Sequence, residues 1–243
     1  MPGQVVDTQT AEEFMGEVLA RVSGDDLVGI ADACAAKSAG FAALLADGRA
    51  ATLGRGDLRR VLRSIFATRR KADAIIDGVG ADRLAAEVHE LLHGPAPVPA
   101  RIERFDAALA GFEDPAFDLP GELLHFTYPD RYWLWTRWMW DPRIETGSLR
   151  LVTMEELDLA GFGRGDTYVR IGEAVTFVHE TGRAAGFTAH GEPTFAIDVF
   201  LASVYAIYMY TVLRMRMTQE FNKIVPDLPD LVRRLLGVYR PEV

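Results

Sequence analysis

The chain is poor in cysteine and has no hydrophobic run long enough to cross a membrane. Cys34 is the one cysteine among 243 residues, so no disulfide can form within the chain. The most apolar window, Val199 to Leu213, holds fifteen uncharged residues, fewer than the roughly 20 that a bilayer requires. These absences predict a protein of a reducing compartment without a membrane span. We expect the apolar window to be a buried core helix.

The sequence also lacks the motifs of several enzyme classes. It has no GxSxG elbow, no CxxC pair and no GxGxxG dinucleotide motif. No basic stretch followed by an apolar run stands at the N-terminus, which predicts a cytoplasmic protein rather than a secreted one. A net charge of −9 argues against non-specific nucleic-acid binding by the whole surface. A local basic face is the remaining route to that role.

Apolar residues recur with the period of helices rather than strands. Thr10 and Glu13 form a capping-box pattern before the first apolar stripe. The stretch Tyr168–Ile171 is the one that could form a brief strand. We predict an all-α globular fold of roughly ten helices with at most one short β element. We expect helices that begin near residues 10, 26, 58, 82, 101, 120, 153, 171, 195 and 230.

Three prolines mark the strongest candidate for a domain boundary. Pro95, Pro97 and Pro99 form a stiff segment after the helix that stops at Gly94. The sequence therefore predicts an N-terminal helical section over 1–94, a linker over 95–99 and a C-terminal helical domain over 100–243. The tetrad Gly-Arg-Gly-Asp occurs at 54–57 and again at 163–166. Each copy predicts a glycine turn whose aspartate caps the next helix.

The run His89-Glu90-Leu-Leu-His93 matches the HExxH pattern of zinc proteases. On a helix, His89 and His93 share a face and can bind one zinc ion, while Glu90 would act as general base on the bound water. Glu113 and Glu122 are the candidates for a third ligand. The alternative is a structural role, with both histidines at a helix C-terminus. A zinc enzyme would lose its metal when His89 is changed to alanine.

All four tryptophans fall within eight residues, in a segment that also carries tyrosine and arginine. If this segment is helical, Trp133 and Trp140 share one face and Trp135 and Trp138 share another. Aromatic and arginine side chains form the anchors of protein interfaces, and they equally fill cores or line small-ligand pockets. The candidate partner-binding residues are Tyr128, Arg131, Trp133, Trp135, Arg137, Trp138 and Trp140.

A cluster of cations follows the first Gly-Arg-Gly-Asp tetrad. Such a cluster is usually a solvated surface, and the alternative is a face that contacts the phosphates of nucleic acid, because arginine forks match phosphate oxygens. The residues are Arg59, Arg60, Arg63, Arg69, Arg70 and Lys71.

Three motifs occur within residues 99–213: Arg-Ile-x-x-Phe over 101–105, Leu-Leu-His-Phe over 123–126 with the tyrosine and tryptophan run after it, and Pro193 followed by Ile197-Asp198. With these motifs, residues 99–213 resemble a helical module of prokaryotic restriction and defence-associated proteins. Trp133 stands where the module has a proline, and Trp138 and Trp140 are additional. The resemblance implies a nucleic-acid-associated defence component.

Together these patterns predict a non-catalytic accessory or scaffold protein that binds a macromolecular partner, or a second copy of itself, through the aromatic segment. No cofactor is expected in that case. The alternatives are a zinc-dependent metallohydrolase and the nucleic-acid-associated defence component.

Overall fold

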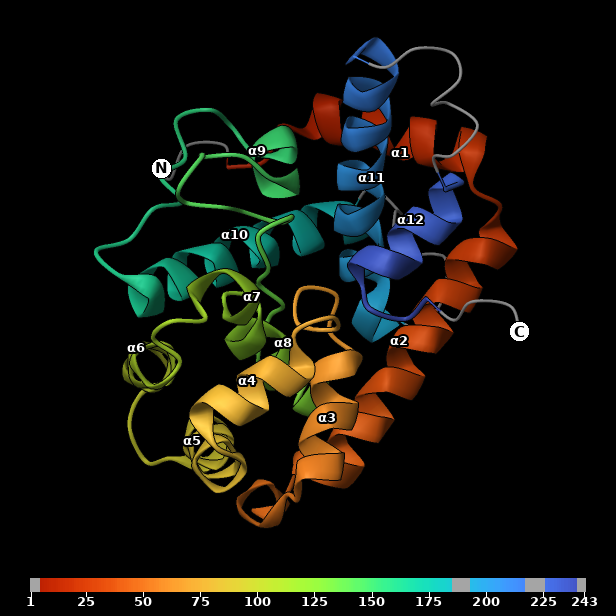
Figure 1. Cartoon of the computed structure of the whole chain (residues 1–243). Coiled ribbons are helices and arrows are strands. Elements are labelled where there is room, and N and C mark those ends of the chain that lie inside the picture. The colour runs from red at the N-terminus through yellow and green to blue at the C-terminus, as the bar shows by residue number, and fades with distance from the viewer. Residues whose placement is uncertain (1–4, 185–192, 217–225, 240–243) are drawn as a thin grey trace. The chain divides into compact units, whose positions relative to one another are not determined.

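A computed structural model of the chain describes residues 5–184, 193–216 and 226–239, and these fold into helices joined by turns (Figure 1). The all-α prediction is confirmed. Within the described ranges, β structure is confined to two isolated bridges, Val6 with Thr153 and Asp141 with Thr146. The stretch 168–171, which could have formed a brief strand, lies inside the helix α10 (Arg164–Ala184).

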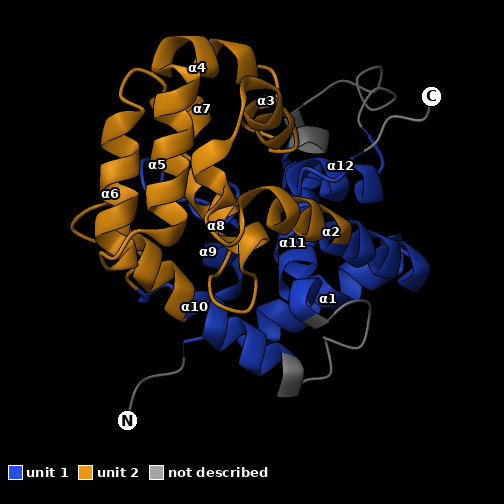
Figure 2. Cartoon of the chain, turned by 90° about the horizontal axis from the view of Figure 1, so that it is seen from below, with its two compact units in different colours: residues 1–35, 138–157, 174–243 blue, residues 36–137, 158–173 orange. Residues whose placement is uncertain are grey.

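The chain divides into two compact units, each assembled from separate stretches of sequence (Figure 2). Unit 1 comprises residues 1–35, 138–157 and 174–243, and unit 2 comprises 36–137 and 158–173. The boundary predicted over 95–99 therefore lies inside unit 2. Its prolines serve a local purpose there, because Pro97 precedes α6 (Val98–Ala108) and Pro99 occupies the first turn of that helix, where a missing N–H costs nothing.

Unit 1 is built around α11, the apolar helix expected from the sequence. Leu201, Ala202 and Val204 are fully buried, which confirms a core helix at this position. The helix packs against α1, α9 and α12 of the same unit (Figure 1). The elements of unit 1 outside the shared helices are α1 Thr8–Arg21, α9 Ser148–Val152, η2 Pro193–Phe195, α11 Ala196–Arg216 and α12 Leu228–Leu235.

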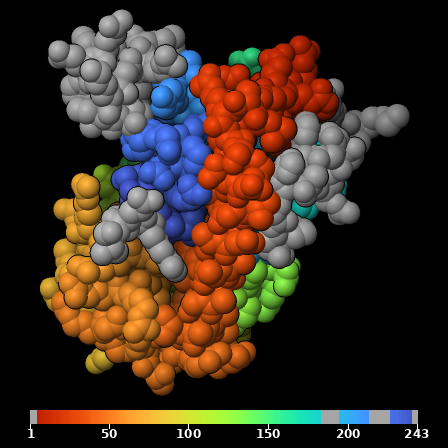
Figure 3. Space-filling model, turned by 90° about the vertical axis from the view of Figure 1, so that its right-hand side faces the viewer, coloured from red at the N-terminus to blue at the C-terminus, as the bar shows by residue number. Residues whose placement is uncertain are grey.

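An ion pair on the surface of unit 1 connects two helices that are far apart in sequence. Arg233 of α12 lies 3.3 Å from Asp26, near the start of α2 (Gly24–Leu45). Figure 3 shows α12 lying along this part of α2. The side chain of Asp26 also accepts a hydrogen bond from Ser23, and this bond together with Arg233 holds the pKa of Asp26 below its usual value.

Unit 2 is built around α5, which packs against α4, α6, α8 and the short helix η1. Leu84, Leu91 and Leu92 of α5 are buried in this core, together with Ile65 and Phe126. The elements of unit 2 outside the shared helices are η1 Arg49–Thr52, α3 Arg55–Arg63, α4 Ala72–Val79, α5 Ala81–His93, α6 Val98–Ala108, α7 Glu113–Ala116 and α8 Leu119–Thr127.

The helices α2 and α10 contribute residues to both units. By length and composition, α2 is the one described helix that could cross a membrane, a property shared by core helices. It buries Ile30 and Cys34 in unit 1, and Phe41 and Leu45 in unit 2. These buried residues contribute to its apolar composition, because each unit takes apolar side chains for its core from its own part of the helix.

Candidate functional site

The HExxH residues lie on the last turns of α5, and all three are half-buried. The rings of His89 and His93 are 5.0 Å apart between centroids, so the helix places them on one face as expected. His93 and Glu90 each contact another protein group. The Nε2 atom of His93 is 2.9 Å from the carbonyl oxygen of Leu45, and a carboxylate oxygen of Glu90 is 3.6 Å from Arg104.

No third ligand approaches this pair in the part of the chain that the structure describes. That part contains no group of three His, Cys, Asp or Glu side chains arranged to hold a metal ion. Of the two glutamates considered as third ligands, Glu113 accepts a hydrogen bond from the backbone N–H of Gly111, and Glu122 is paired with Lys37. The zinc-hydrolase hypothesis therefore stays a prediction that rests on the HExxH pattern alone.

The tryptophan-rich segment is irregular rather than helical between residues 132 and 136. Within unit 2, Trp135 is buried, and its ring lies 5.3 Å from Phe117 and 6.4 Å from Tyr168. The hydroxyl of Tyr168 donates a hydrogen bond to the carbonyl oxygen of Trp133. Burial raises the pKa of Tyr168, so this hydroxyl remains a donor throughout the physiological range. Trp135 thus belongs to the core of unit 2.

The last two tryptophans belong to unit 1 and are buried there. The ring of Trp138 lies 6.3 Å from that of Tyr205 on α11, and the guanidinium of Arg150 lies 5.1 Å from the ring of Trp140. A partner-binding role predicted for Trp135, Trp138 and Trp140 does not fit these positions, because their rings fill the interiors of the two units.

The accessible part of the segment is shorter than predicted. Arg131 is exposed, and its guanidinium lies 5.4 Å from the rings of both Tyr128 and Tyr132, which are half-buried. Trp133 is half-buried beside α10, where a Cβ atom on Gly172 would lie 3.2 Å from the indole ring. These residues form the outer edge of the tryptophan-rich segment in unit 2.

Arg137, another predicted partner-binding residue, points mainly toward carboxylates. Its backbone N–H donates a 2.9 Å hydrogen bond to Asp118, and its side chain lies 3.4 Å from the same carboxylate. Burial raises the pKa of Asp118, and Arg137 opposes that shift. The arginine therefore stabilises a buried charge, and only part of its side chain is left for a partner.

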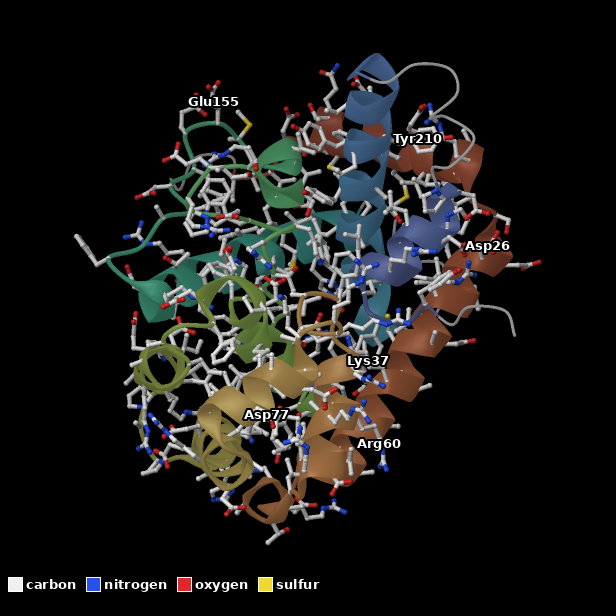
Figure 4. The ribbon with its side chains drawn as sticks, viewed as in Figure 1. Asp26, Lys37, Arg60, Asp77, Glu155 and Tyr210 are labelled. Carbon is white, nitrogen blue, oxygen red and sulfur yellow. The ribbon has the colours of Figure 1, made fainter. Side chains whose placement is uncertain are left out.

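A second buried ion pair was not foreseen from the sequence. Lys37 extends from α2 (Figure 4), and its ammonium group lies 2.6 Å from the carboxylate of Glu122 on α8. The ammonium also lies 3.9 Å from the centroid of the Phe126 ring. Burial raises the pKa of Glu122, and Lys37 lowers it in part. An apolar cavity in unit 2, lined by leucine, valine and phenylalanine side chains, includes neither residue of this pair in its lining.

A half-buried arginine fixes the start of α10. Arg164 lies with its guanidinium 3.6 Å from the centroid of the Phe117 ring, and it donates a 2.7 Å hydrogen bond to the carbonyl oxygen of that residue. Its Nε atom is 3.0 Å from Asp106. Desolvation raises the pKa of Asp106 to about 6, although Arg164 opposes the shift, and Glu103 adds to it.

The raised pKa of Asp106 predicts a pH-dependent contribution to stability. Because the folded-state pKa exceeds the ordinary value of 3.8, the contribution is complete below about pH 4 and is lost as the pH rises through about 6. Asp106→Asn removes this titration. We expect its unfolding free energy, relative to the parent, to rise by about 1 to 2 kcal/mol between pH 4.5 and 7. This value is discounted for solvent screening because the Asp106 side chain is 25% exposed.

Urea unfolding of both proteins at the two pH values measures this difference. The other buried carboxylates titrate equally in parent and variant, so their contributions cancel. The prediction would be contradicted if the difference in unfolding free energy between Asp106→Asn and the parent were the same at pH 4.5 and at pH 7. Asp106 would then titrate at its ordinary value.

Among the residues that the structure describes, the most exposed large apolar side chain is that of Phe162, in the loop that precedes α10. Its backbone N–H donates a 3.0 Å hydrogen bond to the carboxylate of Asp166. Both Gly-Arg-Gly-Asp tetrads lie mostly inside helices, with Asp57 in the first turn of α3 and Asp166 in the first turn of α10, so the predicted glycine turns that precede the helices are wrong. The N–H of Gly161 donates to the hydroxyl of Thr167, and the N–H of Gly165 donates to Glu103.

Close approach of the backbone also holds this loop in place. A Cβ atom on Gly165 would lie 2.3 Å from the carbonyl oxygen of Pro99, so only glycine allows this contact with α6. The loop is therefore fixed from both sides while its tip, Phe162, is fully exposed. The sequence predicts a turn here but does not identify Phe162 as exposed. The one feature of the sequence that indicates its exposure is its position between two glycines.

The predicted basic face is divided by its ion pairs. Arg59 and Arg63 lie 3.1 and 3.9 Å from Asp73 of α4, and Arg60 lies 3.7 Å from Asp57. Figure 4 shows Arg60 on α3 and Asp77 on α4. The three cations in the turn after α3 are exposed and have no ion pair in the described structure; they are Arg69, Arg70 and Lys71.

Comparisons with known proteins give no family for this chain. No family model, curated protein or solved structure matches it. The resemblance of residues 99–213 to a module of restriction and defence-associated proteins therefore stays a prediction from its motifs.

Proposed function

We propose that the chain is a non-catalytic binding protein, and that Phe162 is the anchor that enters an apolar pocket on a macromolecular partner. The observation that carries the proposal is the full exposure of Phe162 on a loop whose backbone is already fixed. Burying a phenylalanine side chain stabilises a complex by about 2 kcal/mol. A fixed loop loses little conformational entropy on binding, so most of that stabilisation contributes to affinity.

The partner-binding surface that we propose extends from Phe162 along the outer face of α10. Val169 is exposed on this helix, one turn before Gly172, where Trp133 packs. Trp133 and Val169 therefore add apolar area on the same side of the helix. The proposed surface therefore runs from the loop to the outer edge of the tryptophan-rich segment. That edge is the accessible part of the segment for which the sequence predicts partner binding.

The charges around Phe162 favour a partner with a basic rim. Glu103 and Asp158 are exposed, and the carboxylates of Glu103 and Asp166 accept hydrogen bonds from the backbone N–H groups of Gly165 and Phe162. Arg170 lies 2.8 Å from Asp158 and 3.4 Å from Asp166 and neutralises part of this charge. Electrostatic complementarity at an interface rim steers association and excludes wrong partners.

Affinity recovery from an extract of the source cells tests this function, with purified chain as bait. We expect Phe162→Ala to lose a specific partner that the parent recovers, with the melting temperature unchanged. Loss of one aromatic anchor typically costs more than 2 kcal/mol, about a 30-fold loss of affinity. The recovered partner is then titrated with purified parent and variant to measure this ratio.

Ile144→Ala is the matched control, because Ile144 is an exposed large apolar residue of unit 1. It should recover the same partner as the parent. The proposal fails if the parent, Phe162→Ala and Ile144→Ala bind the recovered protein with equal affinity.

A further inference from the structure

Positive charge is concentrated in one short segment of this acidic chain. Residues 55–71 contain seven arginine and lysine residues and one aspartate, a net charge of 7 − 1 = +6. The remainder of the chain therefore carries −9 − 6 = −15. A local field of the opposite sign attracts anions to one place on a surface that otherwise repels them.

Ion pairs divide this segment into two functional parts. Arg55 lies 2.6 Å from Asp77, and Arg59 lies 3.1 Å from Asp73, so these arginines hold α3 to α4. The turn that connects the two helices has no such neutralisation. Arg69, Arg70 and Lys71 are exposed there, and the described structure shows no ion pair for any of them.

The same turn presents an exposed aromatic ring on a fixed backbone. Phe66 is 54% exposed, whereas its neighbour Ile65 is buried in the core. The N–H of Arg69 donates a 2.9 Å hydrogen bond to the carbonyl oxygen of Ile65. The buried hydroxyl of Thr68 donates a 2.7 Å hydrogen bond to the carbonyl oxygen of Leu62. The bond from Arg69 to Ile65 joins residues four apart, as in an α-helix. Residues 66, 69 and 70 therefore lie on neighbouring sides of one turn.

We infer that the turn over residues 64–71, the basic turn, binds single-stranded nucleic acid. Arg69, Arg70 and Lys71 contact successive phosphates, and the ring of Phe66 stacks on an unpaired base. Guanidinium forks match phosphate oxygens, and an aromatic ring accepts the face of any base, so the binding carries little sequence preference. This site goes beyond the proposed function and is independent of it, since neither Phe162 nor Trp133 takes part.

Two other polyanions suit the basic turn less well. A duplex keeps its bases stacked, so Phe66 would gain nothing from it, and no described helix carries these cations into a groove. An anionic membrane favours an amphipathic surface with several apolar side chains. The turn offers Phe66 alone, because Ile65 is buried and Ala67 is half-buried. A single exposed ring among cations matches a base more closely than it matches a lipid surface.

Fluorescence anisotropy of a fluorescein-labelled (dT)20 oligonucleotide with the full chain tests the site. We expect micromolar binding at 50 mM salt that weakens steeply as salt is added. Each phosphate contact to a single strand contributes about −0.7 to the slope of log K against log salt. Replacing Arg69, Arg70 and Lys71 together by alanine should reduce the slope by about 2 and lower the affinity at least 30-fold. Phe66→Ala should weaken binding at least fivefold.

Arg69→Ala is compared with Arg83→Ala, which removes one exposed cation from α5 of the same unit. The two variants lose the same charge at different positions, and we expect only Arg69→Ala to weaken binding of (dT)20. A 20-base-pair duplex and vesicles of phosphatidylcholine with 30% phosphatidylserine serve as competing probes, and both should bind more weakly than (dT)20. Phe162→Ala should bind (dT)20 as the parent does, which separates this site from the proposed function.

Three outcomes would each overturn the inference. The first is no binding of (dT)20 at 50 mM salt. The second is equal loss of affinity in Arg69→Ala and Arg83→Ala, which would show that net charge alone is responsible. The third is tighter binding to the duplex or to the vesicles than to (dT)20, which would assign the basic turn to another class of partner.

Discussion

Glu122→Ala is expected to lower the free energy of unfolding by about 3 to 5 kcal/mol. The substitution leaves the ammonium group of Lys37 buried, with the carboxylate 2.6 Å away removed. An uncompensated buried charge is far more costly than a lost surface pair, because it was taken out of water when the chain folded. Urea unfolding followed by far-ultraviolet circular dichroism measures the change.

The double replacement Lys37→Met with Glu122→Leu is the control for this prediction. It removes both charges and keeps apolar volume beside Phe126, so we expect stability within about 1 kcal/mol of the parent, or above it. The prediction would be contradicted if Glu122→Ala cost less than 1 kcal/mol. Water would then reach Lys37, and the pair would act as a surface ion pair.

Trp135→Ala should destabilise unit 2 by about 3 to 5 kcal/mol. Its ring is buried between Phe117 and Tyr168, so alanine leaves a cavity that the surrounding helices cannot fill. Trp133→Ala, two residues away, should cost only about 1 kcal/mol, because that ring is half-buried. Chemical unfolding of the two variants side by side measures the ratio.

A similar cost for the two tryptophans would contradict this account of the segment. If Trp133→Ala were as destabilising as Trp135→Ala, the outer edge of the tryptophan-rich segment would be core as well. Trp133 would then contribute nothing to the partner-binding surface that we propose for unit 2.

The helices could be predicted because their causes are local. Apolar spacing predicts α5, and its stop at Gly94 is where the sequence changes to a proline-rich turn. The apolar window over 199–213 lies in α11, and its first part, residues 199–204, is buried as predicted. Residues 208–212 of the window are half-buried or exposed. The helix predicted from about residue 153 is absent, because residues 155 and 156 form a turn and residues 157–160 are irregular. The first helix begins at Thr8, two residues before the predicted start. Asp7 caps it there by accepting a hydrogen bond from the N–H of Thr10.

The tryptophan-rich segment could not be interpreted from its spacing. Helical geometry, at about 100° per residue, predicts which side chains share a face, but residues 132 to 136 are irregular, so that geometry does not apply to them. Trp135 and Trp138, which that geometry places on one face, belong to different units. Where an irregular chain leaves one core and enters another depends on packing between distant elements, which no local pattern records.

The buried charges were missed for the same reason. Lys37 and Glu122 are 85 residues apart, so no spacing rule connects them. Glu122 was instead considered as a metal ligand. One indication was present in the sequence: Lys37 is the one lysine or arginine in the 22 residues of α2, and a lone cation in an apolar helix needs a partner. The exposure of Phe162 likewise depends on contacts of its loop with α6.

Site-specific photo-cross-linking at position 162 tests the central claim most directly. A benzophenone amino acid replaces Phe162 in the full chain, and in a parallel protein it replaces Ile144, the exposed apolar residue of unit 1. After irradiation in the source cells, we predict one cross-linked protein from position 162 that is absent from position 144. The same set of products from both positions, or none from position 162, would contradict the proposal that this loop anchors a macromolecular partner.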